Sequence, residues 1–387
     1  MTIDEISGRG ALRRFVQFQA ELYKGVDAFV PPMIESEIDC LDPEVNPAFD
    51  FCEVVCYMAR RDGRVVGRAA GIVNRLSNER VGRKQCRFCY VDFIDDEEVS
   101  RALLDRVAAW GRSKGMDELV GPLGLTDLDY EGCLVEGFDQ LSTTVDLYNY
   151  PYYARHFEAY GMRRDAYWNE YHFNMCDEVP EKHRRVAELV KQRYGLRVLK
   201  FTDAKTLVEQ YGHRLFELYN SSYSTLYGFT PLTDRQIDYY IKLYLPQIRL
   251  DLVRIVTDAD DNLLAFGIAC PSLSRAQQKA RGRMWPLGWL YLAKTMYMTR
   301  TSLWGRLLGG GTDTCDLLLM GVRPDMQGKG VNALIFTELI PQMKANGYLY
   351  VESNNELETN RKISNLWGDF DVRINKRRCT FCCSINN

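Results

Sequence analysis

A glycine-rich stretch in the C-terminal half of the chain has the composition of an anion-binding turn. It lies between residues 317–322, an apolar run that predicts a buried strand, and residues 333–343, which predict a helix. The stretch consists of Gln327, Gly328, Lys329, Gly330, Val331 and Asn332. Glycines let such a turn point several backbone N–H groups in one direction, and the positive end of the helix dipole adds to their attraction for an anion. The sequence therefore predicts a site for a phosphorylated ligand.

Two clusters of tyrosines have the chemistry of a substrate pocket, because each ring combines apolar area with a hydroxyl group. They contribute Tyr148, Tyr150, Tyr153, Tyr223 and Tyr227. The same rings could instead pack an interface between two halves of the chain, and the sequence leaves both interpretations open. Asp127, Asp129 and Glu131 share a loop that could hold a cationic amine, although solvated turn residues are the commoner role for such carboxylates.

The composition bounds the class of protein. A chain of 387 residues is too long for one ordinary core and favours two domains. The net charge of -3 gives no electrostatic reason to expect nucleic acid as a partner. The longest apolar stretch, residues 284–292, is too short to span a bilayer, and the polar N-terminus does not have the pattern of a signal peptide. We therefore expect a cytoplasmic protein without a transmembrane segment.

Twelve cysteines raise the question of disulfides or zinc. Without a secretory signal, free thiols in a reducing cytoplasm are expected. Two C-x-x-C spacings, Cys86/Cys89 and Cys379/Cys382, fall in segments with strand character, where residues three apart point to opposite faces. That geometry does not suit zinc, so we expect buried cysteines and no metal site. We expect the basic run at residues 376–378 to be a solvated strand edge.

The chain carries an internal repeat. Residues 54–73 and 252–270 each predict a strand, a tight turn and a second strand. Aligning Gly115 with Gly347, each at the end of a predicted helix, pairs the two preceding helices without a gap. Each half is thus predicted to contain helices, a hairpin, a strand, a helix and a further strand.

A linker near Glu178 divides the chain into predicted domains at residues 1–177 and 182–387. The second domain carries a predicted helical insertion at residues 273–314, which is rich in tryptophan. Aromatic stripes usually pack, so we expect the insertion to cover a face of the sheet or the seam between the halves. The alternative is that its tryptophans contact a long acyl chain or a lipid substrate.

The order of these elements, with the glycine-rich turn after the fourth strand, resembles the GCN5-related N-acetyltransferase (GNAT) fold. Gln327 and Gly330 match the first and fourth positions of the family signature Gln/Arg-x-x-Gly-x-Gly/Ala, and Asn332 stands where the signature has a small residue. Asn360 matches an asparagine that starts a helix after the fifth strand in many members. The resemblance covers both halves, as in bacterial proteins with two tandem units. It implies an α/β (α+β) fold of two GNAT-like domains, each a mixed, mostly antiparallel sheet flanked by helices.

The resemblance also implies that acetyl-CoA or another acyl-CoA binds in the C-terminal half. The implied binding residues are Met320, Gly321, Val322, Gln327, Gly328, Lys329, Gly330, Val331, Asn332 and Asn360. In the family, a backbone N–H of the strand before the turn polarises the thioester carbonyl. The aligned turn of the first half, residues 95–98, carries four carboxylates. These would repel a pyrophosphate, although they also suit an ordinary helix start, so we expect a degenerate first domain without a phosphate loop.

The implied reaction is transfer of an acyl group, with acetyl the expected one, to an amine of a small molecule or peptide. An amine with a pKa near 10 needs a base, and Glu352, at the end of a predicted strand, is the first candidate. The commoner role for a residue such as Glu352 is a strand-end carboxylate that faces solvent. Trp367 stands where many members have the tyrosine that protonates the leaving thiolate, and an indole N–H is not a useful acid.

Two other functions stay open. The first is a non-catalytic CoA-binding or regulatory module, which Trp367 and the degenerate first half favour. The second is a Fem-like aminoacyl transferase, which the near-neutral charge and the intact glycine turn disfavour because aminoacyl-tRNA is strongly anionic. The sequence leaves the acceptor, the acyl chain length and the oligomeric state open.

Overall fold

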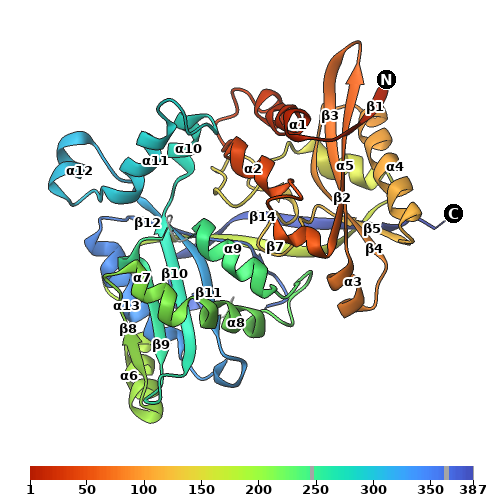
Figure 1. The fold of residues 1–387 in the computed structure, drawn as a ribbon. Coiled ribbons are helices and arrows are strands. Elements are labelled where there is room, and N and C mark those ends of the chain that lie inside the picture. Colours follow the sequence, from red (N-terminus) through yellow and green to blue (C-terminus); the bar gives the residue numbers. More distant parts are fainter. Residues whose placement is uncertain (245–247, 361–365, 387) are drawn as a thin grey trace.

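The computed structural model describes residues 1–244, 248–360 and 366–386 (Figure 1). The N-terminal half contains β1 (Thr2–Ile6), α1 (Arg9–Leu22), α2 (Ile34–Cys40), β2 (Cys52–Arg61), β3 (Arg64–Asn74), α3 (Arg75–Val81), β4 (Gln85–Phe93), α4 (Glu97–Ser113), β5 (Glu118–Gly121), β6 (Cys133–Glu136), α5 (Tyr152–Ala159) and β7 (Arg163–Asn174). The C-terminal half contains α6 (Glu181–Tyr194), β8 (Arg197–Leu199), α7 (Ala204–Leu207), α8 (His213–Ser222), α9 (Asp234–Tyr244), β9 (Val253–Thr257), β10 (Leu263–Pro271), α10 (Ser274–Ala280), α11 (Gly288–Tyr297), α12 (Leu303–Leu308), β11 (Thr314–Val322), α13 (Asn332–Ala345), β12 (Tyr350–Ser353), β13 (Glu356–Leu357) and β14 (Val372–Ser384).

Within these residues the strands form one 14-stranded sheet. Its path runs β1-β2-β3-β4-β5-β14-β7-β12-β11-β10-β9-β8, with β6 paired to β14 and β13 paired to β7. Two pairs on this path, β4–β5 and β11–β12, are parallel, and the others are antiparallel. The parallel pairs occupy equivalent places in the two halves, each with a helix between its strands. The predicted α/β class, with a mostly antiparallel sheet flanked by helices, is confirmed.

The two halves exchange their last strands at the centre of the sheet. The C-terminal strand β14 lies between β5 and β7 and pairs with both. β7 precedes the predicted linker, yet it also pairs with β12 of the C-terminal half. A cut between residues 177 and 182 would therefore separate strands that belong to one sheet. The predicted domains follow the order of the chain, whereas the hydrogen bonds of the sheet run across their boundary.

Helices cover both faces of the sheet in each half (Figure 1). In the N-terminal half, α4 and α5 pack one hydrophobic core, and α1 and α2 pack another on the opposite face. In the C-terminal half, α6 and α13 share one core, while α8 and α9 share the other. β4 is buried along its whole length because both of its faces are covered.

The cysteines and the basic run can now be placed. All twelve cysteines are free, and Cys86 and Cys89 belong to the cores on opposite faces of β4. Across the described residues, no group of three or more His, Cys, Asp or Glu side chains is arranged to hold a metal ion. The expectation of a solvated basic run is wrong for Lys376 and Arg378, whose side chains are buried. The reason is that β14 lies inside the sheet, where both cations meet the buried carboxylate of Glu170.

Candidate functional site

A notch opens in the sheet where β11 and β12 separate. The two strands pair only from Thr314 to Leu317 and from Tyr350 to Ser353. After β12 the chain no longer pairs with β11. Its next strand, β13, pairs with β7 instead. On that side, none of the strands in the described ranges pairs with β11 beyond Leu317.

Polar side chains from α8 and the residue after it mark the edge of this notch. Tyr223 donates from its hydroxyl to the Met320 carbonyl (3.1 Å), and Ser222 donates to the Val322 carbonyl (3.0 Å). N–H and C=O groups of one strand residue point to the same side, so the N–H groups of Met320 and Val322 also face the notch. Gly321, between them, faces β10 instead. The region predicted to polarise a thioester carbonyl is therefore a strand edge whose N–H groups face the notch, where no neighbouring strand pairs with it in the described ranges.

The glycine-rich turn follows this edge directly. Gly328 and Gly330 have φ angles of 73° and 85°, the left-handed region that glycine tolerates best. α13 then begins at Asn332 without a side-chain cap. The N–H groups of Gly328, Gly330 and Val331 meet no hydrogen-bond acceptor among the residues described. These groups, with the start of a 14-residue helix, have the chemistry of a phosphate cradle.

The packing around the two glycines tests this fit. A Cβ atom on Gly330 would lie 2.5 Å from Cγ1 of Val186 on α6, whereas one on Gly328 would meet no atom within 4 Å. Gly330 is thus needed for the turn to approach α6, and Gly328 leaves space beside the turn. A hollow of about 390 Å³ in this space is bordered by Lys329 and Arg193. Two cations beside unpaired N–H groups fit the phosphates of an acyl-CoA.

The remaining predicted cofactor residues lie around the same turn. Gln327 donates from its side-chain amide to the Val322 carbonyl (3.1 Å), which ties the start of the turn to the end of β11. Asn360 donates its backbone N–H to the Leu357 carbonyl (2.8 Å). The helix predicted to start at Asn360 runs into residues 361–365, which lie outside the described ranges.

The aligned turn of the first half is built differently. Asp96 caps α4, where its side chain accepts hydrogen bonds from the N–H groups of Glu98 (2.9 Å) and Val99 (3.3 Å). Asp95 pairs with Arg155 and His156. The protein's own carboxylate therefore occupies the place that an anion would take at this helix start.

A cavity of about 290 Å³ lies on the face of the sheet that α8 and α9 cover. Much of its wall is apolar, and the wall includes Leu215, Phe216, Tyr240, Ile268, Leu318 and Leu357. Both halves contribute, because Trp168 of β7 and the loop at residues 127–131 also line it. Leu318 belongs to the part of β11 beyond its pairing with β12, where the side chain of Asn354 donates to the Leu318 carbonyl (2.8 Å), so the cavity adjoins the notch.

Three carboxylates from the N-terminal half line this mainly apolar cavity. Asp129 accepts hydrogen bonds from the N–H (2.7 Å) and hydroxyl (3.1 Å) of Thr126. Asp127 accepts one from Tyr219, and burial raises the pKa of Asp127 to about 6. Glu131 has no side-chain hydrogen bond in the described chain, and burial, followed by the charge of Asp127, raises its pKa well above the ordinary value. Glu131 therefore has free acceptor atoms inside a mainly apolar space, where a cation would be stabilising.

The predicted pocket tyrosines separate into two groups. Tyr223 and Tyr227 line the cavity. Tyr148, Tyr150 and Tyr153 are absent from its lining and pack in the N-terminal core, where Tyr153 stacks on Phe93 with 4.4 Å between ring centroids. Of the three, only Tyr153 belongs to α5; Tyr148 and Tyr150 lie in the segment before it.

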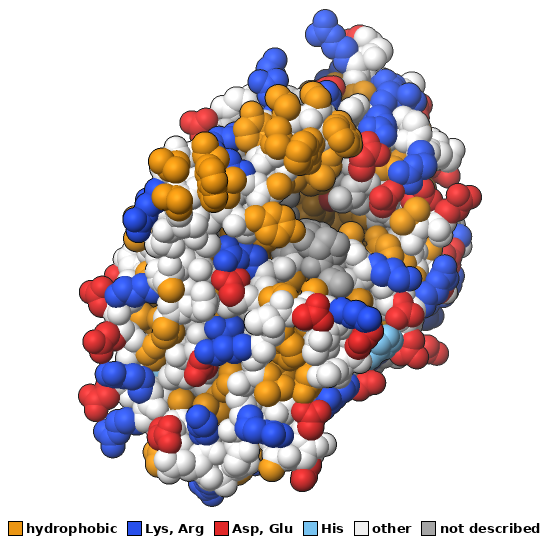
Figure 2. Space-filling view, turned by 60° about the vertical axis from the view of Figure 1, so that its left-hand side comes forward, with side chains coloured by type: hydrophobic (Ala, Val, Ile, Leu, Met, Phe, Trp, Pro, Cys, Tyr) orange, Lys and Arg blue, Asp and Glu red, His pale blue; other side chains and the backbone are white. Residues whose placement is uncertain are grey.

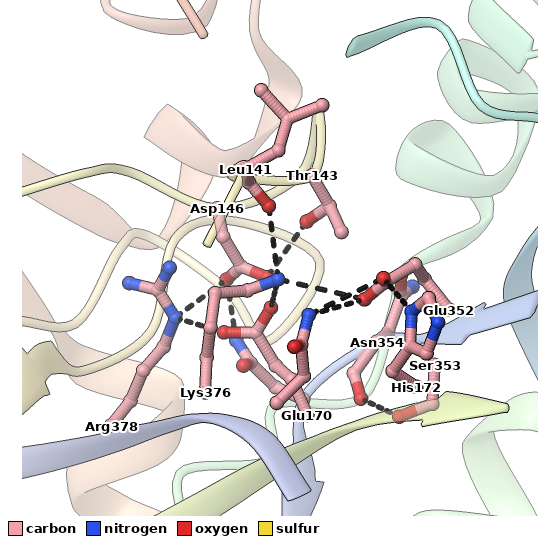
Figure 3. Close-up of polar contacts among 12 residues, drawn as sticks. Leu141, Thr143, Asp146, Glu170, His172, Glu352, Ser353, Asn354, Lys376 and Arg378 are labelled. Atoms are coloured by element: carbon pink, nitrogen blue, oxygen red, sulfur yellow. Dashed lines mark hydrogen bonds and ion pairs between the residues drawn. The ribbon is translucent and has the colours of Figure 1, made fainter. Parts of the chain in front are cut away.

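The structure places Glu352 in a buried charged network at the seam between the halves (Figure 3). Its carboxylate lies 2.6 Å from Nδ1 of His172 and 3.6 Å from Nζ of Lys376. It also accepts a hydrogen bond from the side chain of Asn375 (3.1 Å). Both carboxylate oxygens are thus engaged with donors, which makes Glu352 an ion-pair partner rather than an unoccupied proton acceptor.

The same network joins the exchanged strands. Lys376 of β14 lies 3.0 Å from Glu170 of β7, and Arg378 donates to the same carboxylate at 2.7 Å. Burial opposes ionisation, yet the two cations hold the pKa of Glu170 below its ordinary value. Nearby, burial raises the pKa of Asp316 to about 7, and the charge of Glu352 acts in the same direction.

Trp367 belongs to the core rather than to the notch. Its side chain is buried against Phe173, with 4.7 Å between ring centroids, and against Phe336. Its indole N–H donates to Glu356 (2.8 Å). Burial raises the pKa of Glu356 to about 8, although the indole bond acts against this shift.

Sequence comparisons find two similar bacterial proteins. Protein YghO of Escherichia coli is 26% identical over 86% of this chain and 81% of its own length. The bacterial ceramide synthase of Caulobacter vibrioides is 27% identical over 82% of this chain and 79% of its own length. No protein-family model matches the chain.

Structure comparison decides the fold. A tandem GNAT protein from the clavulanic acid biosynthesis pathway superposes over 100% of this chain and 99% of its own, with a TM-score of 0.57 at 10% identity. The chain has the tandem GNAT fold. A GNAT from Anabaena variabilis also covers 100% of this chain and 73% of its own, with a TM-score of 0.52 at 9% identity. The likeness to GNAT structures extends over both halves, as the sequence repeat predicts.

Within this GNAT fold, sequence reasoning missed the enclosure of the loop carboxylates. Asp127, Asp129 and Glu131 have the composition of a solvated turn, and the chain alone gives no sign of what covers them. The segment after α8 covers these carboxylates. Two residues of the N-terminal half hold that segment in place: Arg87 donates to the Gly228 carbonyl (3.1 Å), and Asn74 donates to Thr230 (3.1 Å). The one available signal was the density of carboxylates in a long loop of an otherwise apolar region.

Proposed function

We propose that the protein is an acyl-CoA-dependent N-acyltransferase whose acceptor is an amine carrying an apolar chain. The observation that carries the proposal is that two features lie side by side. One is the part of β11 beyond Leu317, which does not pair with β12 and leads into the glycine turn; the other is a mainly apolar cavity lined by carboxylates. The N-terminal half would contribute the acceptor side through its loop carboxylates, and the C-terminal half would hold the acyl-CoA.

The chemistry of the residues supports each role. The turn and Lys329 would hold the phosphates, and the N–H groups of Met320 or Val322 would polarise the thioester carbonyl. Glu131 would hold the ammonium group and take the proton that the amine must lose before it attacks the carbonyl carbon. The N–C bond forms as the C–S bond breaks, and the thiolate leaves. We assign the proton donor for that thiolate to Tyr223, whose hydroxyl lies at the notch and would exchange its bond to the Met320 carbonyl for one to the thiolate, whereas Trp367 is buried in the core.

The name of the Caulobacter relative agrees with this acceptor class. A ceramide is the amide of a fatty acid and a long-chain amino alcohol, so its synthesis joins an acyl group to an amine with an apolar tail. A ligand of that kind would match a cavity with a mainly apolar wall and a few polar groups.

Thiol release from acyl-CoA tests the reaction. Acetyl-, octanoyl- and palmitoyl-CoA would be combined with 2-amino alcohols of increasing chain length. We expect release to require both substrates and to rise with the length of the amine. No binding of any acyl-CoA at millimolar concentration would refute the proposal, as would equal binding by the Gly328→Glu, Gly330→Glu double variant.

Two matched substitutions test the base. Glu131→Gln keeps the shape of the side chain and should lower kcat by about 10²- to 10⁴-fold, the usual contribution of a general base. Glu352→Gln is the control, because its carboxylate is already paired with His172 and Lys376. If Glu352→Gln alone abolished turnover in a folded protein, the first sequence-based candidate would be the base instead.

The second candidate function is a non-catalytic CoA-binding module, and the burial of Trp367 in the core favours it. Acyl-CoA binding without thiol release for any amine would support that function. Tyr223→Phe distinguishes the two further, because it should slow turnover by roughly 10-fold or more in an enzyme and leave acyl-CoA binding unchanged.

A further inference from the structure

The insertion between β10 and β11 exposes large apolar side chains on one face of the molecule. The exposed fractions are 77% for Trp285, 72% for Tyr297, 68% for Leu303, 63% for Trp304 and 67% for Leu307. Figure 2 shows such hydrophobic side chains gathered on one part of the surface, beside a hollow. The expectation that these aromatics pack against the sheet or the seam is wrong for α11 and α12. We call residues 284–308 of this insertion the apolar face.

The charge of the insertion is equally one-sided. Residues 272–313, which form the insertion, contain seven Lys and Arg residues and a single carboxylate, Asp313, which pairs with Arg300 at 3.7 Å, although the whole chain has a net charge of -3. The seven are Arg275, Lys279, Arg281, Arg283, Lys294, Arg300 and Arg306. All of them except Lys294 are exposed. Exposed tryptophan, tyrosine and leucine framed by cations are typical of a surface that binds anionic lipid.

Contacts with the rest of the protein fix this face in place. Gln278 of α10 donates to the carbonyls of Asp27 and Phe29 (both 2.8 Å), so α10 does cover the seam between the halves. Thr301 donates to the Ala345 carbonyl at the end of α13 (2.8 Å), and Lys294 donates to the Leu308 carbonyl (2.6 Å). The apolar side chains are therefore presented on an ordered hairpin of helices.

We propose that the apolar face docks on the surface of a bilayer that contains anionic lipid. The tryptophans and tyrosines would lie at the headgroup level, the leucines would enter the acyl boundary, and the cations would meet lipid phosphates. No helix in the described ranges combines the length and apolarity needed to cross a bilayer. A second copy of the chain is a poor occupant, because a two-fold dimer through this face would oppose one set of cations to the other.

The face also adjoins the cavity described above. Leu273 and Met296 of the same insertion contribute to the wall of that cavity. Docking would therefore bring the cavity close to a source of apolar ligands. The docking proposal does not depend on acyl transfer, since vesicle binding needs neither acyl-CoA nor turnover.

Vesicle flotation with the full-length protein tests the proposal. Vesicles of phosphatidylglycerol and phosphatidylcholine would be compared with vesicles of phosphatidylcholine alone. We expect binding to the anionic vesicles that weakens with added salt, and much weaker binding to the neutral ones. Absence of binding to anionic vesicles at low salt would overturn the proposal.

Two variants locate the contact. Lys279→Gln, Arg283→Gln, Arg306→Gln should weaken binding by roughly 100-fold, since each cation near an anionic surface contributes about fivefold. The matched control is Arg185→Gln, Lys191→Gln, Lys205→Gln, which removes as many exposed cations from α6 and α7 and should bind like the wild type. Equal weakening in both charge variants would show a non-specific attraction and overturn the assignment of this face.

The apolar contribution has its own pair of variants. Trp304→Ser, Leu307→Ser should weaken vesicle binding at least tenfold, while Val45→Ser, Val81→Ser changes exposed apolar residues elsewhere and should not. Unchanged melting temperatures would show that the variants fold. If the protein formed a dimer without lipid and Trp304→Ser, Leu307→Ser abolished it, the face would be an interface between copies and the bilayer proposal would fail.

Discussion

Gly330→Ala is the substitution for which the structure gives the clearest quantitative expectation. The φ angle of 85° strains an alanine by about 1–2 kcal/mol. The added Cβ would also lie 2.5 Å from Cγ1 of Val186, about 1 Å inside the normal contact distance. Relieving such an overlap in a packed region costs about 1–3 kcal/mol. We therefore expect the free energy of unfolding to fall by about 2–5 kcal/mol.

The same change should weaken the binding of acyl-CoA. If the turn moves away from α6, the N–H groups of Gly330 and Val331 move with it, and a misaligned hydrogen bond to a phosphate loses about 1.5–3 kcal/mol. That corresponds to roughly a 10- to 150-fold higher Kd. Urea denaturation measures the stability, and calorimetric titration with acetyl-CoA measures the affinity.

Three further variants separate strain from overlap. Gly82→Ala introduces a similar strain, with φ of 65° and no atom within 4 Å, far along the chain from the turn. It should cost about 1 kcal/mol and leave acyl-CoA binding unchanged. Gly328→Ala has the same open surroundings within the turn, so its stability should match that of Gly82→Ala. Adding Val186→Ala to Gly330→Ala should restore part of the affinity. A stable Gly330→Ala protein with wild-type affinity would refute the reasoning.

Two further predictions concern stability. Glu356 has a pKa of about 8 in the folded protein, above its ordinary value, so its contribution to stability is fully present below about pH 4.5 and is lost as the pH rises through 8. In the wild type, titration of Glu356 should lower the free energy of unfolding by up to about 4 kcal/mol between pH 5 and 8. Glu356→Gln keeps an acceptor for Trp367 but does not titrate, so this decrease should be absent in the variant. An unchanged pH profile would contradict the prediction. Lys376→Met should cost about 3–5 kcal/mol because it leaves Glu170 short of a partner, whereas Lys182→Met, which breaks an exposed pair with Asp369, should cost at most about 1 kcal/mol. Equal losses in the two lysine variants, measured by urea denaturation, would contradict the burial argument.

Features encoded by short stretches of sequence were predictable. The hairpins, the glycine turn and the helix after it each depend on residues within a few positions of one another, and the structure has these elements at the expected places. Even the opposite orientations of Cys86 and Cys89 follow from the two-residue period of a strand. The repeat then placed these elements in a tandem GNAT order.

Features that depend on distant contacts were not predictable. Lys376 and Arg378 have the sequence pattern of a solvated edge, and their burial follows from the insertion of β14 beside β7, about two hundred positions away in the chain. Glu352 has the pattern of a free strand-end carboxylate, and its partners His172 and Lys376 come from two other strands.

The sequence by itself determined the local chemistry of this protein: a glycine-rich turn at a helix start in one half and an acidic, self-capped helix start in the other. Those properties follow from backbone freedom and charge at neighbouring residues. Only the tertiary structure decided that Glu131 lies in a mainly apolar cavity and that Trp285 and Trp304 lie on the surface. Burial depends on which segments cover a residue. The segments that cover Glu131 come from the other half of the chain, whereas none of the described segments covers Trp285 or Trp304.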